Sequence, residues 1–364
     1  MLRSLRRPLL VLGLFFALSG ATFAADFTWT GGAATDDWQD AANWTLSAGV
    51  DDGANGFPDG TDRALFDSAV TPSVTNLPAS LAELSISDAG ANVTLGVGET
   101  LNTSSINVSA GTLTTGDNSL LVSSNVTIDG TLDASAQTGG EVIDANGNFT
   151  VSPAGNMVFG AGGLDVIGAT SINNGANPIT LTNPANNLGS SVLLTTTGNA
   201  EIVDASGLTL GTSNVGGNLT ATAVTGNITD SGTVTVGGDA TFTTSAGGAD
   251  INLDTLAITG SVSLSTTGGG GNATIVNSGP LAFGASAVEG NLTATAGGAV
   301  TQAGALDVNG TTTVDAGAAP ITLTNAGNDF TGAVALTTTG ANDAAVVDTN
   351  ALTLGASSLG GNLN

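Results

Sequence analysis

The sequence predicts an all-β fold, a right-handed parallel β-helix in which short strands wind around a common axis. Three observations indicate this architecture. A short phrase returns along the chain, as GGNLTATA at 216–223 and as EGNLTATA at 289–296. Apolar and polar residues alternate between the returns, which is the pattern of strands with one buried face. No stretch carries a helical period of useful length, so coils of strands are expected to stack on one another.

The first 24 residues are predicted to be an export signal. Arg3, Arg6 and Arg7 form a positive head, and residues 8–18 are an apolar run too short to span a bilayer. Small residues just before position 25 suit cleavage after Ala24. We therefore expect a bacterial chain, exported by the Sec route, that is secreted or displayed at the cell surface and does not insert into a membrane after cleavage.

Residues 25–75 are predicted to cap the first coil. This segment contains all three tryptophans of the chain and many of its acidic residues. A stacked rod exposes strand edges and apolar core at its first coil, so an aromatic segment has to cover them. Arg63 is the one basic residue after the export signal, and we expect it to pair with a cap acid such as Asp62 or Asp67. The β-helix is then predicted over residues 76–364.

The spacing of the phrases follows a pattern that is clearest from residue 147. The openers of successive phrases are separated by 21, 22 and 27, then 21, 22 and 30, then 20, 22 and 29 positions. These steps add to 70, 73 and 71 residues, which predicts a super-repeat of three coils with three strands each. At a rise of about 4.8 Å per coil, about twelve coils give a rod on the order of 58 Å long. The openers are Gly147, Gly168, Ser190, Gly217, Gly238, Gly260, Gly290, Gly310, Gly332 and Gly361.

Alternation also predicts which side chains face the core. The second and fourth residues after an opener are mostly apolar, such as Leu219 and Ala221, and are expected to point inward. The third and fifth are mostly Thr or Ser and are expected to stand outward as two ladders along the rod. The ladder residues are Thr150, Ser152, Thr220, Thr222, Thr241, Thr243, Ser263, Ser265, Thr293 and Thr295. Because β-branched Thr suits a pleated surface, strand propensity by itself also explains these ladders.

Two parts of the chain resemble known proteins. The sequence TWTGG…DDWQDAANW…FPDGTDRALFD in the cap resembles the head of large secreted bacterial proteins with autotransporter-type β-strand repeats. The phrases GNLTATAGGAVTQAGALDVNGTTTVDAG, at 290–317, and ITLTNAGNDFTGAVALTTTG, at 321–340, resemble filamentous-haemagglutinin-like adhesins. The resemblance implies a surface-exposed or secreted adhesin-like array. Its partners would be surface glycans or host or matrix proteins.

Charge and composition exclude several function classes. After the signal, thirty acidic residues face a single Arg, so the chain lacks the cations that nucleic acids and anionic bilayers require. The chain has no Cys and no His, which excludes Ser–His–Asp and Cys–His nucleophile systems. A hydrolase of neutral polysaccharides needs only two carboxylates and stays open as an alternative. Ice binding is the other alternative, because outward Thr ladders form a grid of hydroxyl and methyl groups.

The acidic segment DDGANGFPDGTD, residues 51–62, is the candidate cation site. Carboxylate and amide oxygens are the hard ligands that Ca²⁺ prefers, although the spacing here is not that of an EF-hand. A solvated acidic loop explains the same residues, so no cofactor is required and Ca²⁺ is the one cofactor to test. The candidate ligands are Asp51, Asp52, Asn55, Asp59 and Asp62.

We therefore expect a non-enzymatic, adhesin-like or extracellular-matrix-like rod that acts as a projecting interaction scaffold. Three longer turns, at 195–201, 266–274 and 337–345, are expected on one edge at every third coil as contact points. The last phrase, GGNLN, breaks off at Asn364, so the array is expected to continue into, or stack with, further repeats.

Overall fold

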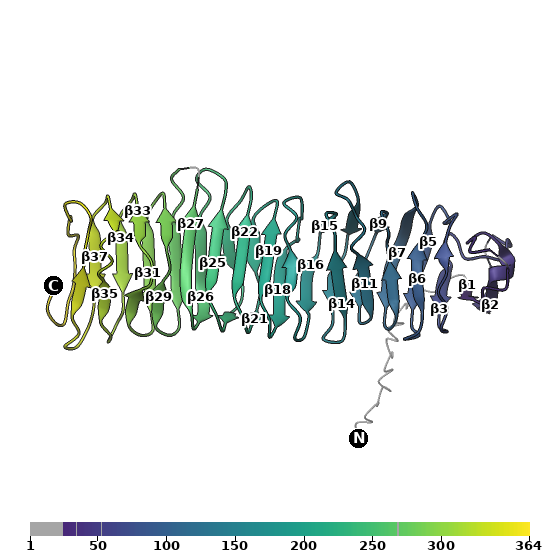
Figure 1. Cartoon of the computed structure of the whole chain (residues 1–364), viewed down its shortest axis with the longest axis horizontal. Coiled ribbons are helices and arrows are strands. Elements are labelled where there is room, and N and C mark those ends of the chain that lie inside the picture. Colours follow the sequence, from purple (N-terminus) through teal and green to yellow (C-terminus); the bar gives the residue numbers. More distant parts are fainter. Residues whose placement is uncertain (1–24, 34, 52, 268) are drawn as a thin grey trace, which may run out of the picture.

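The computed structural model describes residues 25–33, 35–51, 53–267 and 269–364, and the predicted export signal lies outside them. Figure 1 shows a rod with β1 and β2 at one end and the carboxyl-terminal residues at the other. In the described residues, regular structure is strand apart from one 3-10 turn, η1 (Ala41–Asn43). The prediction of an all-β parallel β-helix is confirmed. No helix in these residues is long and apolar enough to cross a membrane.

One sheet runs through the described residues from end to end of the rod. This long sheet has 21 strands, and its strand pairs are parallel except for that of β1 with β2. Its members are β1 (Ala25–Trp29), β2 (Trp44–Gly49), β3 (Arg63–Phe66), β5 (Leu81–Ile86), β7 (Thr100–Val108), β9 (Ser119–Val122), β10 (Val126–Ile128), β12 (Val142–Ala145), β13 (Phe149–Val151), β15 (Gly163–Val166), β16 (Ala169–Asn173), β18 (Ser191–Thr196), β20 (Leu208–Leu210), β21 (Ser213–Val215), β23 (Ile228–Asp230), β24 (Val234–Val236), β26 (Ile251–Ile258), β28 (Ala273–Asn277), β31 (Leu292–Ala296), β34 (Thr312–Asp315) and β37 (Val334–Thr337).

Between passes through the long sheet, the described chain passes through one of two smaller parallel sheets. The short sheet comprises β4 (Ser73–Val74), β6 (Asn92–Leu95), β8 (Thr112–Thr114), β11 (Thr131–Ala134) and β14 (Asn156–Phe159). The second sheet comprises β17 (Ile179–Leu181), β19 (Ala200–Asp204), β22 (Leu219–Ala223), β25 (Ala240–Thr244), β27 (Ser261–Thr266), β29 (Leu281–Phe283), β30 (Ser286–Val288), β32 (Val300–Gln302), β33 (Leu306–Val308), β35 (Ile321–Leu323), β36 (Asp329–Phe330) and β38 (Ala344–Val346).

The predicted super-repeat of three coils needs a correction, because it spans three and a half windings. Four in-register neighbours on successive strands of the second sheet are Leu219, Ala240, Val262 and Phe283. Three windings from Leu219 therefore end at Phe283, whereas the repeated phrase returns nine residues later, at Leu292. Leu292 belongs to β31 of the long sheet. The long steps of the sequence pattern thus contain an extra half winding, and successive super-repeats begin on different sheets.

The inward-facing residues predicted from alternation are all buried. They contribute to one continuous apolar core that extends through the described length of the rod. None of them is more than 1% exposed: Phe149, Val151, Val192, Leu194, Leu219, Ala221, Ala240, Phe242, Val262, Leu264, Val334 and Leu336. Parallel pairing of successive windings places each of these side chains over its counterpart, so apolar surface is covered from above and below.

The aromatic residues of the predicted cap form a cluster at the first winding. The ring centroids of Trp29 and Trp44 lie 4.9 Å apart, and those of Trp38 and Trp44 lie 4.8 Å apart, both edge to face. The Phe66 ring stacks on Trp29 at 5.7 Å. The Trp38 indole N–H donates to the Pro58 carbonyl at 2.9 Å, and the Trp44 indole N–H donates to the Trp38 carbonyl at 2.7 Å. Both buried donors are therefore satisfied.

The strand ladder already begins within the segment predicted as the cap. Strand β1 pairs in parallel with β3, and β3 pairs in parallel with β5. The segment 25–75 is thus continuous with the first winding of the rod, and its β2 covers the free edge of β1 as an antiparallel neighbour.

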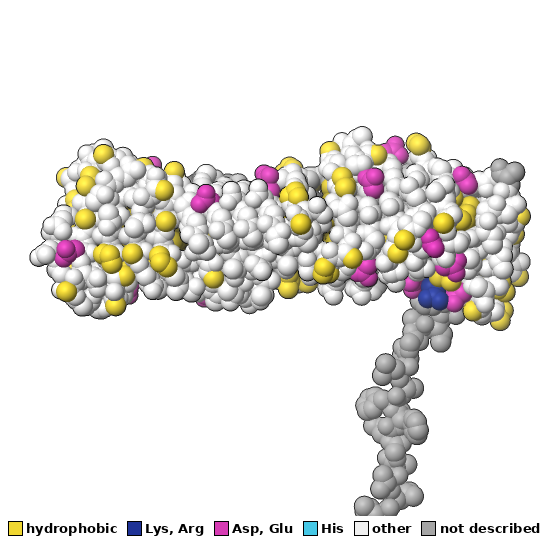
Figure 2. Space-filling view, turned by 60° about the horizontal axis from the view of Figure 1, so that its bottom comes forward, with side chains coloured by type: hydrophobic (Ala, Val, Ile, Leu, Met, Phe, Trp, Pro, Cys, Tyr) yellow, Lys and Arg dark blue, Asp and Glu magenta, His cyan; other side chains and the backbone are white. Residues whose placement is uncertain are grey.

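The partner of Arg63 differs from the prediction. Its Nε and Nη2 atoms donate to the two carboxylate oxygens of Asp26, at 3.0 and 2.7 Å. Asp62 and Asp67 were favoured because they are close in sequence, whereas in-register strands bring Asp26 beside Arg63 from 37 positions away. Glu83 lies beside Arg63 on the other side, on β5. Figure 2 shows basic side-chain atoms only at the capped end of the visible face, next to acidic ones.

Glu83 gives the capped end a pH dependence. Burial raises the pKa of its carboxyl above the ordinary value, the Arg63 charge opposes this rise, and the Asp26 charge adds to it. The stability contributed by protonated Glu83 is fully present below about pH 4.3 and is lost as the pH rises through the raised folded-state pKa. We expect Glu83→Gln to remove this loss, so that the variant unfolds at a higher temperature than the parent chain at pH 7 and at the same temperature at pH 4. Thermal unfolding across this range measures it, with the exposed Glu201→Gln as control; an equal pH dependence in parent and Glu83→Gln would contradict it.

Candidate functional site

Many of the repeated phrases open with Gly followed by Asn or Asp, and the structure shows what this pair does. The Asn272 side-chain oxygen accepts a hydrogen bond from the backbone N–H of Asn291, one winding further on, at 2.9 Å. The Asn291 side-chain oxygen accepts in turn from the Thr311 N–H at 2.8 Å. These residues lie at corners, where the chain turns into a strand, so side chains supply there the bond that backbone carbonyls supply within a sheet.

Such corner bonds form columns along the rod. In each column, the side-chain oxygen of one residue accepts from the backbone N–H of the next: Asn125, Asn148 and Ala169; Asn199, Asn218, Asp239 and Ser261; Asn227, Asp250, Asn272, Asn291 and Thr311; Asp343 and Asn362. At Asp239, bonds from the backbone N–H and the hydroxyl of Ser261 lower the pKa of the carboxyl. An ionised Asp can therefore replace Asn as the acceptor.

The Gly of the pair is required by the same contact. A Cβ on Gly290 would lie 2.7 Å from Asn272 Oδ1, and a Cβ on Gly260 would lie 2.7 Å from Asp239 Oδ1. These distances are shorter than van der Waals contact, so any larger residue would displace the corner bond or the backbone. The Gly-Asn pair is thus a structural unit of the fold, and we look for a binding surface among its neighbours.

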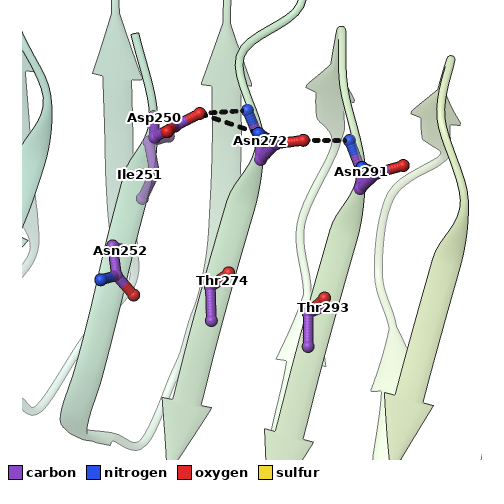
Figure 3. A pocket seen from close by; sticks show the side chains of 7 residues that line it. All are labelled: Asp250, Ile251, Asn252, Asn272, Thr274, Asn291 and Thr293. Atoms are coloured by element: carbon purple, nitrogen blue, oxygen red, sulfur yellow. Dashed lines mark hydrogen bonds between the residues drawn. The ribbon is translucent and has the colours of Figure 1, made fainter.

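The outer surface of the long sheet is hollowed beside the longest corner column. The hollow has a volume of about 340 Å³ and lies across β26, β28 and β31 (Figure 3). Its two walls are outward-facing rows: Asp250, Asn272 and Asn291 form one, and Asn252, Thr274 and Thr293 form the other. The residues between the rows point inward, as Ile251 does, so the backbone forms the floor of this polar trough.

The side chains of the polar trough retain much of their hydrogen-bonding capacity. The Asn272 amide nitrogen donates to Asp250 Oδ1 at 3.1 Å, which leaves the second carboxylate oxygen of Asp250 without a bond. Within the described part of the chain, the side chains of Asn252, Thr274 and Thr293 make no hydrogen bond to protein. One carboxylate oxygen, one amide and two hydroxyls are therefore available to a ligand.

The lower row of the polar trough continues in both directions along the long sheet. Its in-register members are Thr209, Thr229, Asn252, Thr274, Thr293 and Thr313, and the row ends at Ala335. Sequence reasoning identified only Thr293 of these residues, because it followed the phrase openers and treated them as one column. The signal that could have found the rest is the length of the long steps, which exceed one winding by about one strand and its turn.

The ten predicted ladder residues face outward, but they do not form two continuous ladders. Two rows of three are in register on β22, β25 and β27 of the second sheet: Thr220, Thr241 and Ser263, and Thr222, Thr243 and Ser265. The other four lie on or directly after strands of the long sheet: Thr150 and Ser152 at β13, and Thr293 and Thr295 at β31. The half winding in each long step moves the ladder from one sheet to the other.

The three longer turns do not share one edge, for the same reason. Turns 195–201 and 337–345 lead from the long sheet to the second sheet, whereas turn 266–274 leads from the second sheet to the long sheet. They therefore alternate between the two edges of the rod, and the prediction of a single contact edge is corrected.

The predicted calcium ligands lie in a loop with its own hydrogen bonds. The Asn55 amide donates to Asp59 at 2.8 Å, Asp51 accepts from the Gly56 N–H at 2.8 Å, and Asp62 is buried. Asp52 lies outside the described residues. Among the described residues, no group of three or more His, Cys, Asp or Glu side chains is arranged to hold a metal. Ca²⁺ binding stays a prediction, which thermal unfolding in calcium and in chelator would decide.

Two carboxylates of the long sheet have the arrangement that the hydrolase alternative needs. Asp144 and Asp165 are in-register neighbours on β12 and β15. Burial and the negative charge of Asp165 raise the pKa of Asp144, and Asp165 accepts from the Asn187 amide at 2.9 Å. An acid with a raised pKa beside an ionised carboxylate is a pattern of glycoside hydrolysis, but it also arises wherever two acids share a strand ladder. The pair does not line the polar trough.

Comparison with known proteins gives a repeat family. A family model described as repeats of unknown function (DUF5649) matches residues 197–269 and 270–337. The two matches begin 73 residues apart, which is also the distance from Gly217 to Gly290. The chain is therefore similar to this family over two adjacent units, each about as long as three and a half windings. Neither curated proteins nor solved structures gave a match.

The corner contact generates a test with an internal control. Gly290→Ala should lower the free energy of unfolding by about 1–3 kcal/mol, because its Cβ would overlap Asn272 Oδ1 and the Gly271 carbonyl, both at 2.7 Å. Gly279→Ala makes the same chemical change where an added Cβ would meet nothing within 4 Å, and should leave stability unchanged. Denaturant unfolding measures both, and equal stability of the two variants would show that the corner contact does not constrain the fold.

Proposed function

We propose that this repeat protein is a non-enzymatic scaffold, secreted or displayed at the cell surface, that projects as a rod and holds partners through weak, repeated contacts. Its partners would be surface glycans or host or matrix proteins, as for an adhesin or an extracellular-matrix protein. The resemblance of its cap and phrases to autotransporter-type and filamentous-haemagglutinin-like proteins supports this proposal. The similarity to a repeat family of unknown function supports the scaffold and leaves the ligand to experiment.

The observation that carries the proposal is the alternation of one surface pattern between two sheets. Asn199, Asn272 and Asp343 are equivalent residues of successive super-repeats, 73 and 71 positions apart. Asn199 and Asp343 directly precede β19 and β38 of the second sheet, whereas Asn272 directly precedes β28 of the long sheet. A rod that repeats its surface on two sheets can engage partners on more than one side, and several weak contacts then add to a stable attachment.

Ice binding is a second candidate, and one observation favours it. Two in-register rows of three hydroxyl residues cover β22, β25 and β27 of the second sheet. In the row of Thr220 the grid is bounded by Glu201 on one side and by Gly284 on the other, so it is three windings wide. Measurement of thermal hysteresis during ice growth would separate this candidate from the scaffold.

The scaffold proposal predicts that both sheets are accessible outside the cell. The chain has no native cysteine, so single substitutions can be labelled selectively with a maleimide that does not cross membranes. Thr180→Cys on the second sheet and Thr293→Cys on the long sheet are exposed, and both should be labelled on intact cells or in the medium. Ala221→Cys is a buried control that should react only after unfolding. Labelling of the exposed positions only after cell lysis would contradict the proposal.

A further inference from the structure

We infer that the polar trough across β26, β28 and β31 binds a linear, uncharged polysaccharide laid along the rod axis. This inference rests on the proposed scaffold function and specifies the ligand of one surface. Its first support is geometric, because the two walls of the trough run across the strands and therefore along the rod (Figure 3). Each wall offers one polar side chain per winding, at a rise of about 4.8 Å, which is comparable with the repeat of sugar rings in an extended chain.

The chemistry of the lining selects a ligand that both donates and accepts hydrogen bonds. Thr274 and Thr293 offer hydroxyls, Asn252 offers both halves of an amide, and Asp250 offers a free carboxylate oxygen. Sugar hydroxyls match such a set because each donates one bond and accepts others. A peptide strand would instead need an unpaired strand edge, but β28 is paired on both sides, with β26 and with β31.

Charge excludes anionic ligands from the trough. It contains one carboxylate and no cation, and the one basic residue of the described chain, Arg63, is bound to Asp26 at the capped end. A uronic-acid polymer, a phosphate or a nucleic acid would therefore meet only acidic groups in the excess of Asp and Glu over the whole surface. An uncharged polyol carries no such penalty.

The trough lacks aromatic side chains, so a single contact is expected to be weak. Length compensates for this weakness, since Thr229 and Thr313 extend the lower row to further windings. The equivalent surface on the second sheet carries Glu201 in place of Thr274 and Thr220 in place of Thr293. We therefore assign the stronger glycan contact to the long sheet, where both positions are hydroxyls, and we expect long polymers to bind better than short ones.

The test is native affinity electrophoresis of the purified mature chain in gels that contain defined polymers. The panel comprises three neutral polymers (glucomannan, xylan-type arabinoxylan and hydroxyethyl cellulose), polygalacturonate as an anion and chitosan as a cation. The parent chain should be retarded by at least one neutral polymer and not by polygalacturonate. The double variant Thr274→Val/Thr293→Val keeps side-chain shape, and it should weaken the retardation roughly tenfold or more because two hydrogen bonds are lost. Thr150→Val, the same change on the long sheet outside the trough, should bind like the parent.

Three results would overturn the inference: no retardation by any neutral polymer, retardation by the charged polymers alone, or retardation that the folded double variant retains. Circular dichroism establishes that each variant is folded. Release of reducing ends from a bound polymer would refute the non-enzymatic scaffold but would leave the binding surface in place. A chain that is labelled outside the cell but binds no glycan would lose only this inference, so the two proposals fail separately.

Discussion

Hydrogen bonding between successive windings at the corners is the constraint on which the rest of this structure depends. Parallel backbone pairing fixes the windings at about 21 residues, as between Leu219 and Ala240, but it ends where the chain leaves a sheet. At those corners an Asn or Asp side chain accepts from the next winding, and the Gly before that position leaves room for it. The repeated Gly-Asn phrase follows from this contact, and the outward rows beside it remain free for other work.

The second consequence is that sequence period and structural period are not the same. Three and a half windings return the phrase with its inward and outward residues intact, but on the other sheet. A ligand surface encoded once in the sequence is thereby presented in two directions. The two directions are not identical, because substitutions such as Glu201 against Thr274 make one surface more acidic than the other.

Much of the fold could be predicted from sequence because its signals are local. Alternation alone identified Leu219, Phe242 and Val262 as core, and the spacing of glycines gave the length of a winding. The half winding could not be recognised, because an excess of residues in a long step is consistent with either an insertion or an extra strand. The trough was missed for that reason, since Asn252 and Thr274 lie between the openers that were aligned. The Arg63–Asp26 pair depends on register between distant strands, which a local pattern does not contain.

Pairwise cross-linking in this cysteine-free chain tests the half winding most directly. Thr274→Cys with Thr293→Cys places two thiols on in-register neighbours, about 4.8 Å apart at the backbone, and a short bifunctional reagent should join them in high yield. Ser263→Cys with Thr293→Cys pairs positions that a three-coil repeat would stack directly, and here the yield should be negligible because they lie on different sheets. Efficient joining of the second pair, without joining of the first, would contradict the account.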